Sequence, residues 1–119
     1  MTNQDFIDYL LSVIEDKEIS FTDSILDKSK EKTICVYQTS NVTLPKSDGY
    51  KILPVTIIII YGKNGYKAQK FVQDLFQNSL YHQKLINEQF YIDIKTSPRF
   101  LGRTETGCFE YAIDCKLIY

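Results

Sequence analysis

Residues 97–119, SPRFLGRTETGCFEYAIDCKLIY, contain the pattern that decides the fold of this chain. From Phe109 to Leu117 every second residue is apolar, and most of the residues between them are charged. This period of two predicts a strand with one buried and one wet face. Pro98 and Gly102 precede it, and they predict an elaborate loop that joins this strand to an earlier one.

Five further elements follow from the patterns outside this segment. Apolar residues recur at three- and four-residue spacing in residues 3–15 and 66–79, which predicts two helices with one apolar face each. Residues 16–32 show no sustained period and are interpreted as an exposed connection. Three more strands are predicted by runs rich in β-branched and aromatic residues or by alternation: 33–37, 52–61 and 90–94.

These elements predict a single α+β domain over residues 1–119. The expected architecture has two layers, with two helices packed on a four-stranded mixed or antiparallel sheet. The expected order is helix, strand, strand, helix, strand, strand. A chain of 119 residues is long enough for one hydrophobic core and not for two.

The run VTIIIIY at residues 55–61 lacks the alternation of a strand with one wet face. Ile58 and Ile60 point away from the other isoleucines, so both faces of this strand require burial. Each isoleucine left in water would forgo about 1.5–3 kcal/mol. Two interpretations stay open: residues 16–32 and 41–51 cover the second face, or a second copy of the chain covers it.

Composition excludes several classes of function. The formal net charge is −1, from 14 basic and 15 acidic residues, and gives no overall field that would attract DNA or an acidic membrane, so any contact with nucleic acid must be local. No signal peptide is evident, and the longest apolar run is far shorter than the roughly 20 residues of a membrane helix. We therefore expect a soluble, intracellular protein. Three cysteines without metal or redox spacing are expected to be buried free thiols: Cys35, Cys108 and Cys115.

No residues have the spacing of a catalytic, cofactor-binding or metal-binding motif, so we do not expect an enzyme. His82 is the only histidine and is interpreted as a surface loop residue. Catalysis by Cys108 with His82 is the weakest hypothesis, because no nucleophile motif surrounds either residue. The segment GKNG at residues 62–65 precedes a predicted helix, where anions can bind. Since the full phosphate-binding motif is absent, it is interpreted as a strand-to-helix turn.

The segment at 97–119 resembles the closing segment of small bacteriophage proteins of the minor capsid or tail terminator family. In that family a P-x-F-L-G-R turn and a glycine precede an aromatic, alternating terminal strand. The predicted order of elements is also the one that a lambda-type tail terminator implies. The chain departs from the family at Cys108, where a basic or polar residue is more usual, and in its charged segment after the first helix.

The resemblance implies a structural virion protein without a cofactor, a tail-terminator-like domain that forms a ring, typically a homohexamer. Such a ring caps the phage tail tube at its head-proximal end and joins the tube to head-completion or connector proteins. It implies location in the virion tail, and in the host cytoplasm before assembly, with transient contact to DNA in the lumen and none to a membrane. The related alternative is a head-tail connector or a component of a phage-tail-like particle. The alternative of another class is a small-molecule-binding α+β regulatory domain.

The loop before the last strand offers the most distinctive surface. Two arginines flank an apolar pair, and arginine can bind a carboxylate or a phosphate with two hydrogen bonds. Three interpretations stay open: a solvated hairpin loop, a subunit contact, and a lumen loop that touches DNA. The candidate subunit-interface residues, including the two isoleucines of the doubly apolar strand, are Arg99, Phe100, Leu101, Arg103, Ile58 and Ile60.

Overall fold

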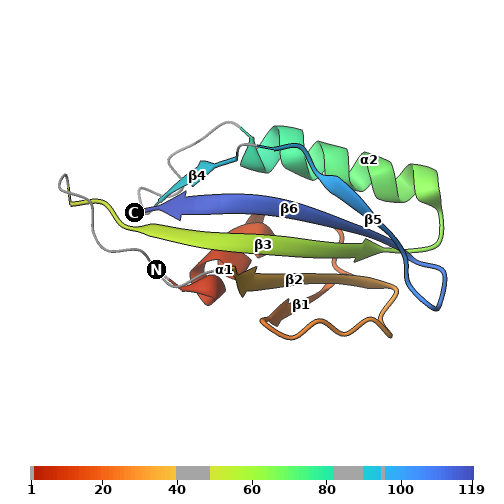
Figure 1. Cartoon of the computed structure of the whole chain (residues 1–119). Helices are drawn as coiled ribbons and strands as arrows, with labels where there is room; N and C mark the ends of the chain where they lie inside the picture. The colour runs from red at the N-terminus through yellow and green to blue at the C-terminus, as the bar shows by residue number, and fades with distance from the viewer. Residues whose placement is uncertain (1, 40–48, 82–89, 95) are drawn as a thin grey trace.

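The computed structural model describes residues 2–39, 49–81, 90–94 and 96–119, which form two α-helices and a six-stranded mixed sheet (Figure 1). The elements in chain order are α1 (Asn3–Val13), β1 (Ser20–Asp23), β2 (Lys32–Gln38), β3 (Ile52–Tyr61), α2 (Gly65–Leu75), the π-helical turn η1 (Phe76–Leu80), β4 (Tyr91–Asp93), β5 (Arg99–Arg103) and β6 (Phe109–Ile118).

The predicted four-stranded sheet and its order of elements are wrong, because β1 and β5 are additional strands. β1, with the sequence SFTD, lies in the part that was interpreted as a connection. It contains one apolar residue, Phe21, and is held by pairing with β2 and by packing of that ring on the core. β5 lies in the segment that was predicted to be a loop, because Pro98 and Gly102 are residues typical of turns and interrupt the apolar pattern of a strand. Both strands depend on a partner and not on local preference.

The strand order is β1-β2-β3-β6-β4, and β5 pairs with β6 as well. β1 runs parallel to β2, and every other pair is antiparallel. β6 is the most connected strand, since it pairs with β3 along most of its length. On its other side, β4 occupies the end near Ile118 and β5 the end near Phe109.

Both helices pack against one face of the sheet and enclose the main core. In Figure 1, α1 lies behind β3. The capping box of α1 is closed by Thr2 and Asp5, and Asn64 caps α2. The core joins side chains from both helices to alternate residues of β3: Phe6, Leu10, Val72, Leu75, Leu53, Val55, Ile57 and Ile59.

No described helix packs on the other face of the sheet, but the connection from β1 to β2, residues 24–31, lies on it. Because β1 and β2 are parallel, the chain must return from the end of one to the start of the other. Leu26 packs on this face, and Lys28 reaches across it to within 3.5 Å of Glu110 on β6. The apolar cluster beneath consists of Cys35, Ile58 and Ala112, with Leu26 and Tyr37 packed against it.

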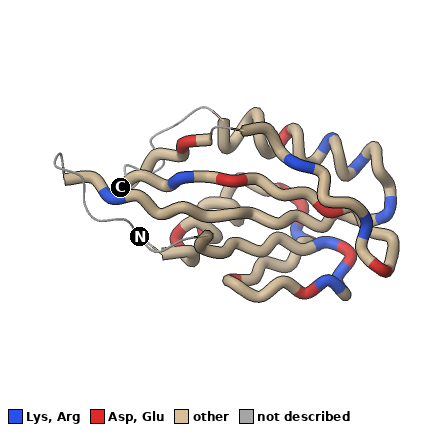
Figure 2. The backbone as a smooth tube through the Cα atoms, in the orientation of Figure 1, with Lys and Arg blue, Asp and Glu red and all other residues tan. Residues whose placement is uncertain are grey.

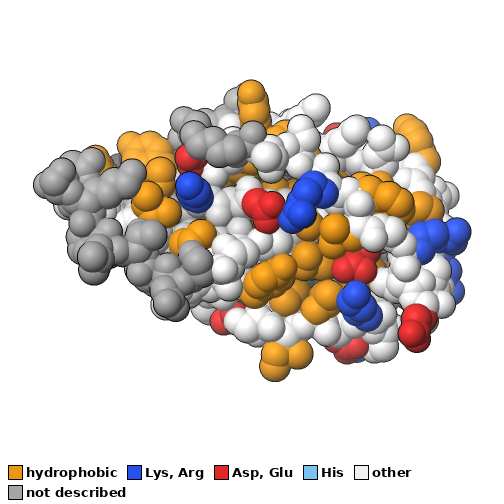
Figure 3. Space-filling view, in the orientation of Figure 1, with side chains coloured by type: hydrophobic (Ala, Val, Ile, Leu, Met, Phe, Trp, Pro, Cys, Tyr) orange, Lys and Arg blue, Asp and Glu red, His pale blue; other side chains and the backbone are white. Residues whose placement is uncertain are grey.

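Figure 3 shows hydrophobic side chains gathered at the centre of this face, between charged residues. Ile58 keeps 6% of its surface exposed and Ile60 none, so the chain itself covers both. The sequence left open whether residues 16–32 cover the second face of β3. Within that segment, residues 24–31, which connect β1 to β2, do cover it. Of the other segment proposed as a cover, residues 41–48 lie outside the described residues.

All three cysteines are buried, as expected, and their thiols are free. Burial raises the pKa of the Cys115 thiol above its usual value, with the neighbouring Asp114 carboxylate adding to the effect. His82 lies outside the described residues. Within the described part of the chain, no helix combines the length and apolar character needed to cross a membrane.

Candidate interface at the β5 edge

Residues 97–107, predicted to be a loop, contain the strand β5 and a tight turn into β6. The Thr104 amide donates to the Cys108 carbonyl at 2.8 Å, and the Gly107 amide donates to the Thr104 carbonyl at 2.8 Å. The Thr104 hydroxyl accepts from the Cys108 amide at 3.1 Å. Gly107 has a φ of 88°, which glycine adopts with little strain. These hydrogen bonds hold the hairpin as an ordered unit.

A β-bulge at Leu101 decides which way the side chains of β5 point. Phe100 is opposite Tyr111, but Gly102 is opposite Glu110, so Leu101 is the extra residue on its strand. Gly102 has a φ of 113°, which few other residues can adopt. Because the bulge shifts the alternation by one residue, the arginines at the two ends of β5 lie on opposite faces of the sheet.

Arg99 lies on the face without helices. Its guanidinium Nη2 is 3.0 Å from Oδ2 of Asp114 on β6. The other carboxylate oxygen of Asp114 accepts a hydrogen bond of 2.7 Å from the Thr56 hydroxyl on β3. Since Arg99 and Asp114 are each about half exposed, at 54% and 48%, the pair is a surface feature that links β5, β6 and β3.

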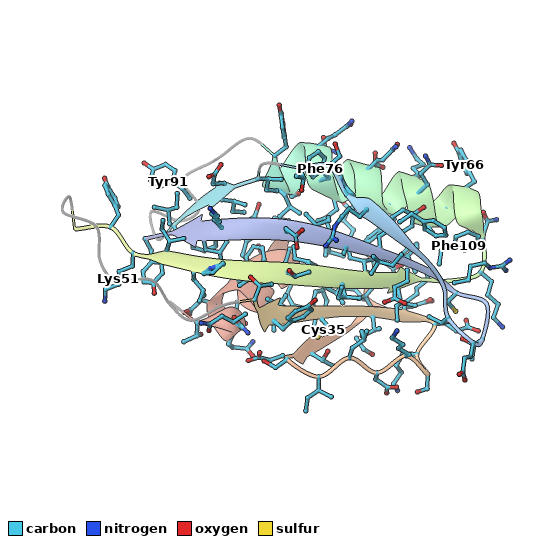
Figure 4. The ribbon with its side chains drawn as sticks, in the orientation of Figure 1. Cys35, Lys51, Tyr66, Phe76, Tyr91 and Phe109 are labelled. Atoms are coloured by element: carbon cyan, nitrogen blue, oxygen red, sulfur yellow. The ribbon has the colours of Figure 1, made fainter. Side chains whose placement is uncertain are left out.

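Arg103 lies on the helix side, at the α2 end of the hairpin. Its guanidinium carbon is 4.9 Å from the centre of the Phe109 ring, and its Nε donates to the Gly107 carbonyl at 3.2 Å. The Phe109 ring in turn packs on Gly65, the first residue of α2 (Figure 4). A Cβ atom at Gly65 would lie 2.9 Å from the ring, so this approach requires glycine.

Phe100 and Leu101 remain exposed between the two arginines. Phe100 is 55% exposed and Leu101 is 47% exposed. The Phe100 ring contacts the rings of Tyr111 and Phe109, with centroid distances of 5.3 and 5.9 Å. It also borders a groove of about 450 Å³ between α2 and β5, whose wall includes Phe76. An aromatic ring is therefore held at the surface in a defined position.

The β5 edge, which we define as Arg99, Phe100, Leu101 and Arg103, contains four of the six predicted interface residues. The other two, Ile58 and Ile60, lie on β3 and are buried by the chain itself. Among the described strands, β5 pairs only with β6, so the backbone groups of its outer edge pair with no described strand.

Several supporting residues were not predicted as part of this site. They are Phe76, Phe109, Tyr111 and Asp114, which contact or border the β5 edge. The alternation in residues 109–117 could have indicated that Phe109 and Tyr111 share a face. It could not have indicated which residues of β5 lie beside them, because the bulge sets that register.

Among the described residues, no cluster of histidine, cysteine, aspartate or glutamate could hold a metal ion. No protein-family model and no curated protein matches this sequence.

Proposed function

We propose that this protein is a structural subunit of a phage tail, of the tail terminator kind, which joins its neighbours through the β5 edge. The observation that carries the proposal is the exposure of Phe100 and Leu101 on β5, an edge strand whose outer side pairs with no described strand. The resemblance in residues 97–119 supports the phage assignment. In this role the ring would cap the tail tube and meet the head-completion proteins.

The β5 edge has the composition of a binding hot spot, the small group of residues that supplies most of the binding energy of an interface. Hot spots are rich in aromatic residues and arginine and are surrounded by contacts that exclude water. Here Phe100 is supported by two neighbouring rings, and Arg99 and Arg103 are held by Asp114 and Phe109. Since these side chains are already ordered, association would lose less conformational entropy at this edge.

A ring requires a contact between two different surfaces of the same chain. Contacts of this head-to-tail kind close into a ring when the rotation between subunits fits a whole number of copies. The β5 edge would supply one of the two surfaces. Ile58 and Ile60 would contribute to the subunit's own stability and not directly to the contact, because they are buried.

The test compares Phe100→Ala and Arg103→Glu with the wild type. We expect a strong loss of self-association, measured by sedimentation over a range of concentrations, while the far-UV circular dichroism stays native. Tyr66→Ala is the matched control, because Tyr66 is an aromatic residue on α2 with 75% exposure. In particles, both β5 variants should give tails of irregular length.

Three results would overturn the proposal. The first is a wild-type protein that is monomeric both in concentrated solution and in assembled particles. The second is a loss of association in Tyr66→Ala equal to the loss in Phe100→Ala. The third is tails of normal, uniform length in micrographs of particles that carry Phe100→Ala.

A further inference from the structure

A second surface, at the opposite edge of α2 from the β5 groove, has a different chemistry. It is a groove of about 530 Å³ between the end of β3 and the first turns of α2. Figure 2 shows basic positions along α2. Lysines make up four of the residues that line the groove: Lys32, Tyr61, Gly62, Lys63, Asn64, Lys67, Lys70, Phe71 and Asp74.

Three of these lysines form a row along the rim. Lys63 lies in the turn before α2, Lys67 and Lys70 lie three residues apart on one side of α2, and all three line the groove. Three lysines on one rim can contact up to three phosphates of a nucleic-acid backbone, one for each ammonium group.

The floor of the groove is aromatic. The rings of Tyr61 and Phe71 stack with centroids 4.1 Å apart and planes 4° from parallel. Lys32 lies over the Tyr61 ring, 4.7 Å from its centre, and is held by Asp16 at 2.9 Å and by Glu18 at 3.4 Å. Lys32 is therefore part of the folded framework.

The acidic residues beside the row do not prevent an anion from binding. Lys63 is 3.5 Å from Glu31, and Lys70 is 3.6 Å from Asp74, with both partners exposed in each pair. Exposed pairs of this kind contribute about 0–1 kcal/mol, so a phosphate can replace the carboxylate at little cost. Lys67 makes no ion pair within the described part of the chain.

We propose that this groove binds the phosphate backbone of a nucleic acid, with Lys63, Lys67 and Lys70 as the phosphate contacts. The start of α2 is not the basis of the proposal, because the Asn64 side chain already accepts a hydrogen bond from the Lys67 amide. The proposal does not depend on ring formation. It uses residues that lie outside the β5 edge.

The experiment measures the anisotropy of a short labelled DNA duplex over a series of salt concentrations. Three phosphate contacts predict a slope of about −2.7 in a plot of log K against log salt, which is an affinity loss of about 40-fold between about 50 and 200 mM salt. Lys63→Gln, Lys67→Gln and Lys70→Gln should each reduce the slope by about 0.9. Glu31→Gln and Asp74→Asn should tighten binding, because each removes a competing carboxylate.

Lys51→Gln is the matched control, since Lys51 is exposed at the far end of β3 from the groove (Figure 4). It should leave affinity and slope unchanged. The proposal is overturned if Lys51→Gln weakens binding as much as Lys67→Gln, or if the duplex shows no salt-dependent binding. It is also overturned if ATP displaces the duplex at equal phosphate concentration, since the groove would then bind single nucleotides. Phe100→Ala should bind DNA normally, which separates this proposal from the ring.

Discussion

Replacing Asp16 with asparagine should weaken the fold through one cluster of hydrogen bonds. Asp16 follows α1, and its Oδ2 atom accepts from the Tyr61 hydroxyl at 2.6 Å and from Lys32 Nζ at 2.9 Å. Its Oδ1 atom accepts from the Glu18 amide at 2.9 Å. The cluster joins the chain after α1 to the end of β3 and the start of β2.

The lowered pKa of Asp16 gives the size of its contribution to the free energy of unfolding. The hydrogen bond from Tyr61, followed by those from Lys32 and the Glu18 amide, lowers this pKa from 3.8 to about 2. At 1.36 kcal/mol per pKa unit, and with the Asp16 side chain 21% exposed to screening, the ionised form stabilises the fold by about 1–2 kcal/mol. Because the folded pKa is the lower one, this stability is complete above pH 3.8 and is lost as the pH falls to about 2.

Urea unfolding followed by circular dichroism, repeated from neutral pH downwards, measures this effect. Asp16→Asn should lower the free energy of unfolding by about 1–2 kcal/mol at neutral pH, and the difference from wild type should shrink as the pH falls below 3.8. Glu18→Gln is the control, because Glu18 is 80% exposed and 3.4 Å from Lys32. The reasoning fails if the loss in Asp16→Asn does not change with pH, or if Glu18→Gln costs as much.

Three further outcomes are expected. Gly102→Ala should lower the free energy of unfolding by about 1–3 kcal/mol in urea titrations, because its φ of 113° strains any residue with a Cβ even though no atom lies within 4 Å; an unchanged midpoint would contradict this. Leu26→Ala should cost about 1–2 kcal/mol, less than a fully buried leucine, because Leu26 only partly covers Ile58; no loss would mean that the connection does not shield that face. The three cysteines should resist a thiol reagent in the native protein and react in denaturant, since all are buried; rapid native labelling would refute their burial.

The helices and strands with a strong apolar pattern could be predicted from the sequence. The strands that depend on pairing with a neighbouring strand, β1 and β5, could not. Helices α1 and α2 and the long strands β3 and β6 show clear apolar patterns. β1 has four residues, and its pattern of burial carries no alternation. It exists because its backbone pairs with β2, which is a long-range contact that no local pattern reports.

The candidate site was predictable in its residues but not in its geometry. The arginines and the apolar pair at the start of the hairpin stood out by composition. The bulge at Leu101 could not be predicted, and it separates Arg99 from Arg103 onto opposite faces. The apolar second face of β3 was correctly recognised as needing a cover. Leu26 could not be identified as part of that cover, because it is an isolated apolar residue in a charged segment.

The position of β6 has a consequence for the order in which the protein can be made and folded. β6 comes after every other strand in the sequence, yet it pairs with β3, β4 and β5. During synthesis, at about 5–20 residues per second, one edge of β3 stays without its partner strand until β6 leaves the ribosome. The hairpin of β2 and β3 can form early, but the sheet cannot close before β6 has been made. A nascent chain stalled before residue 109 should therefore bind chaperones and aggregate on release.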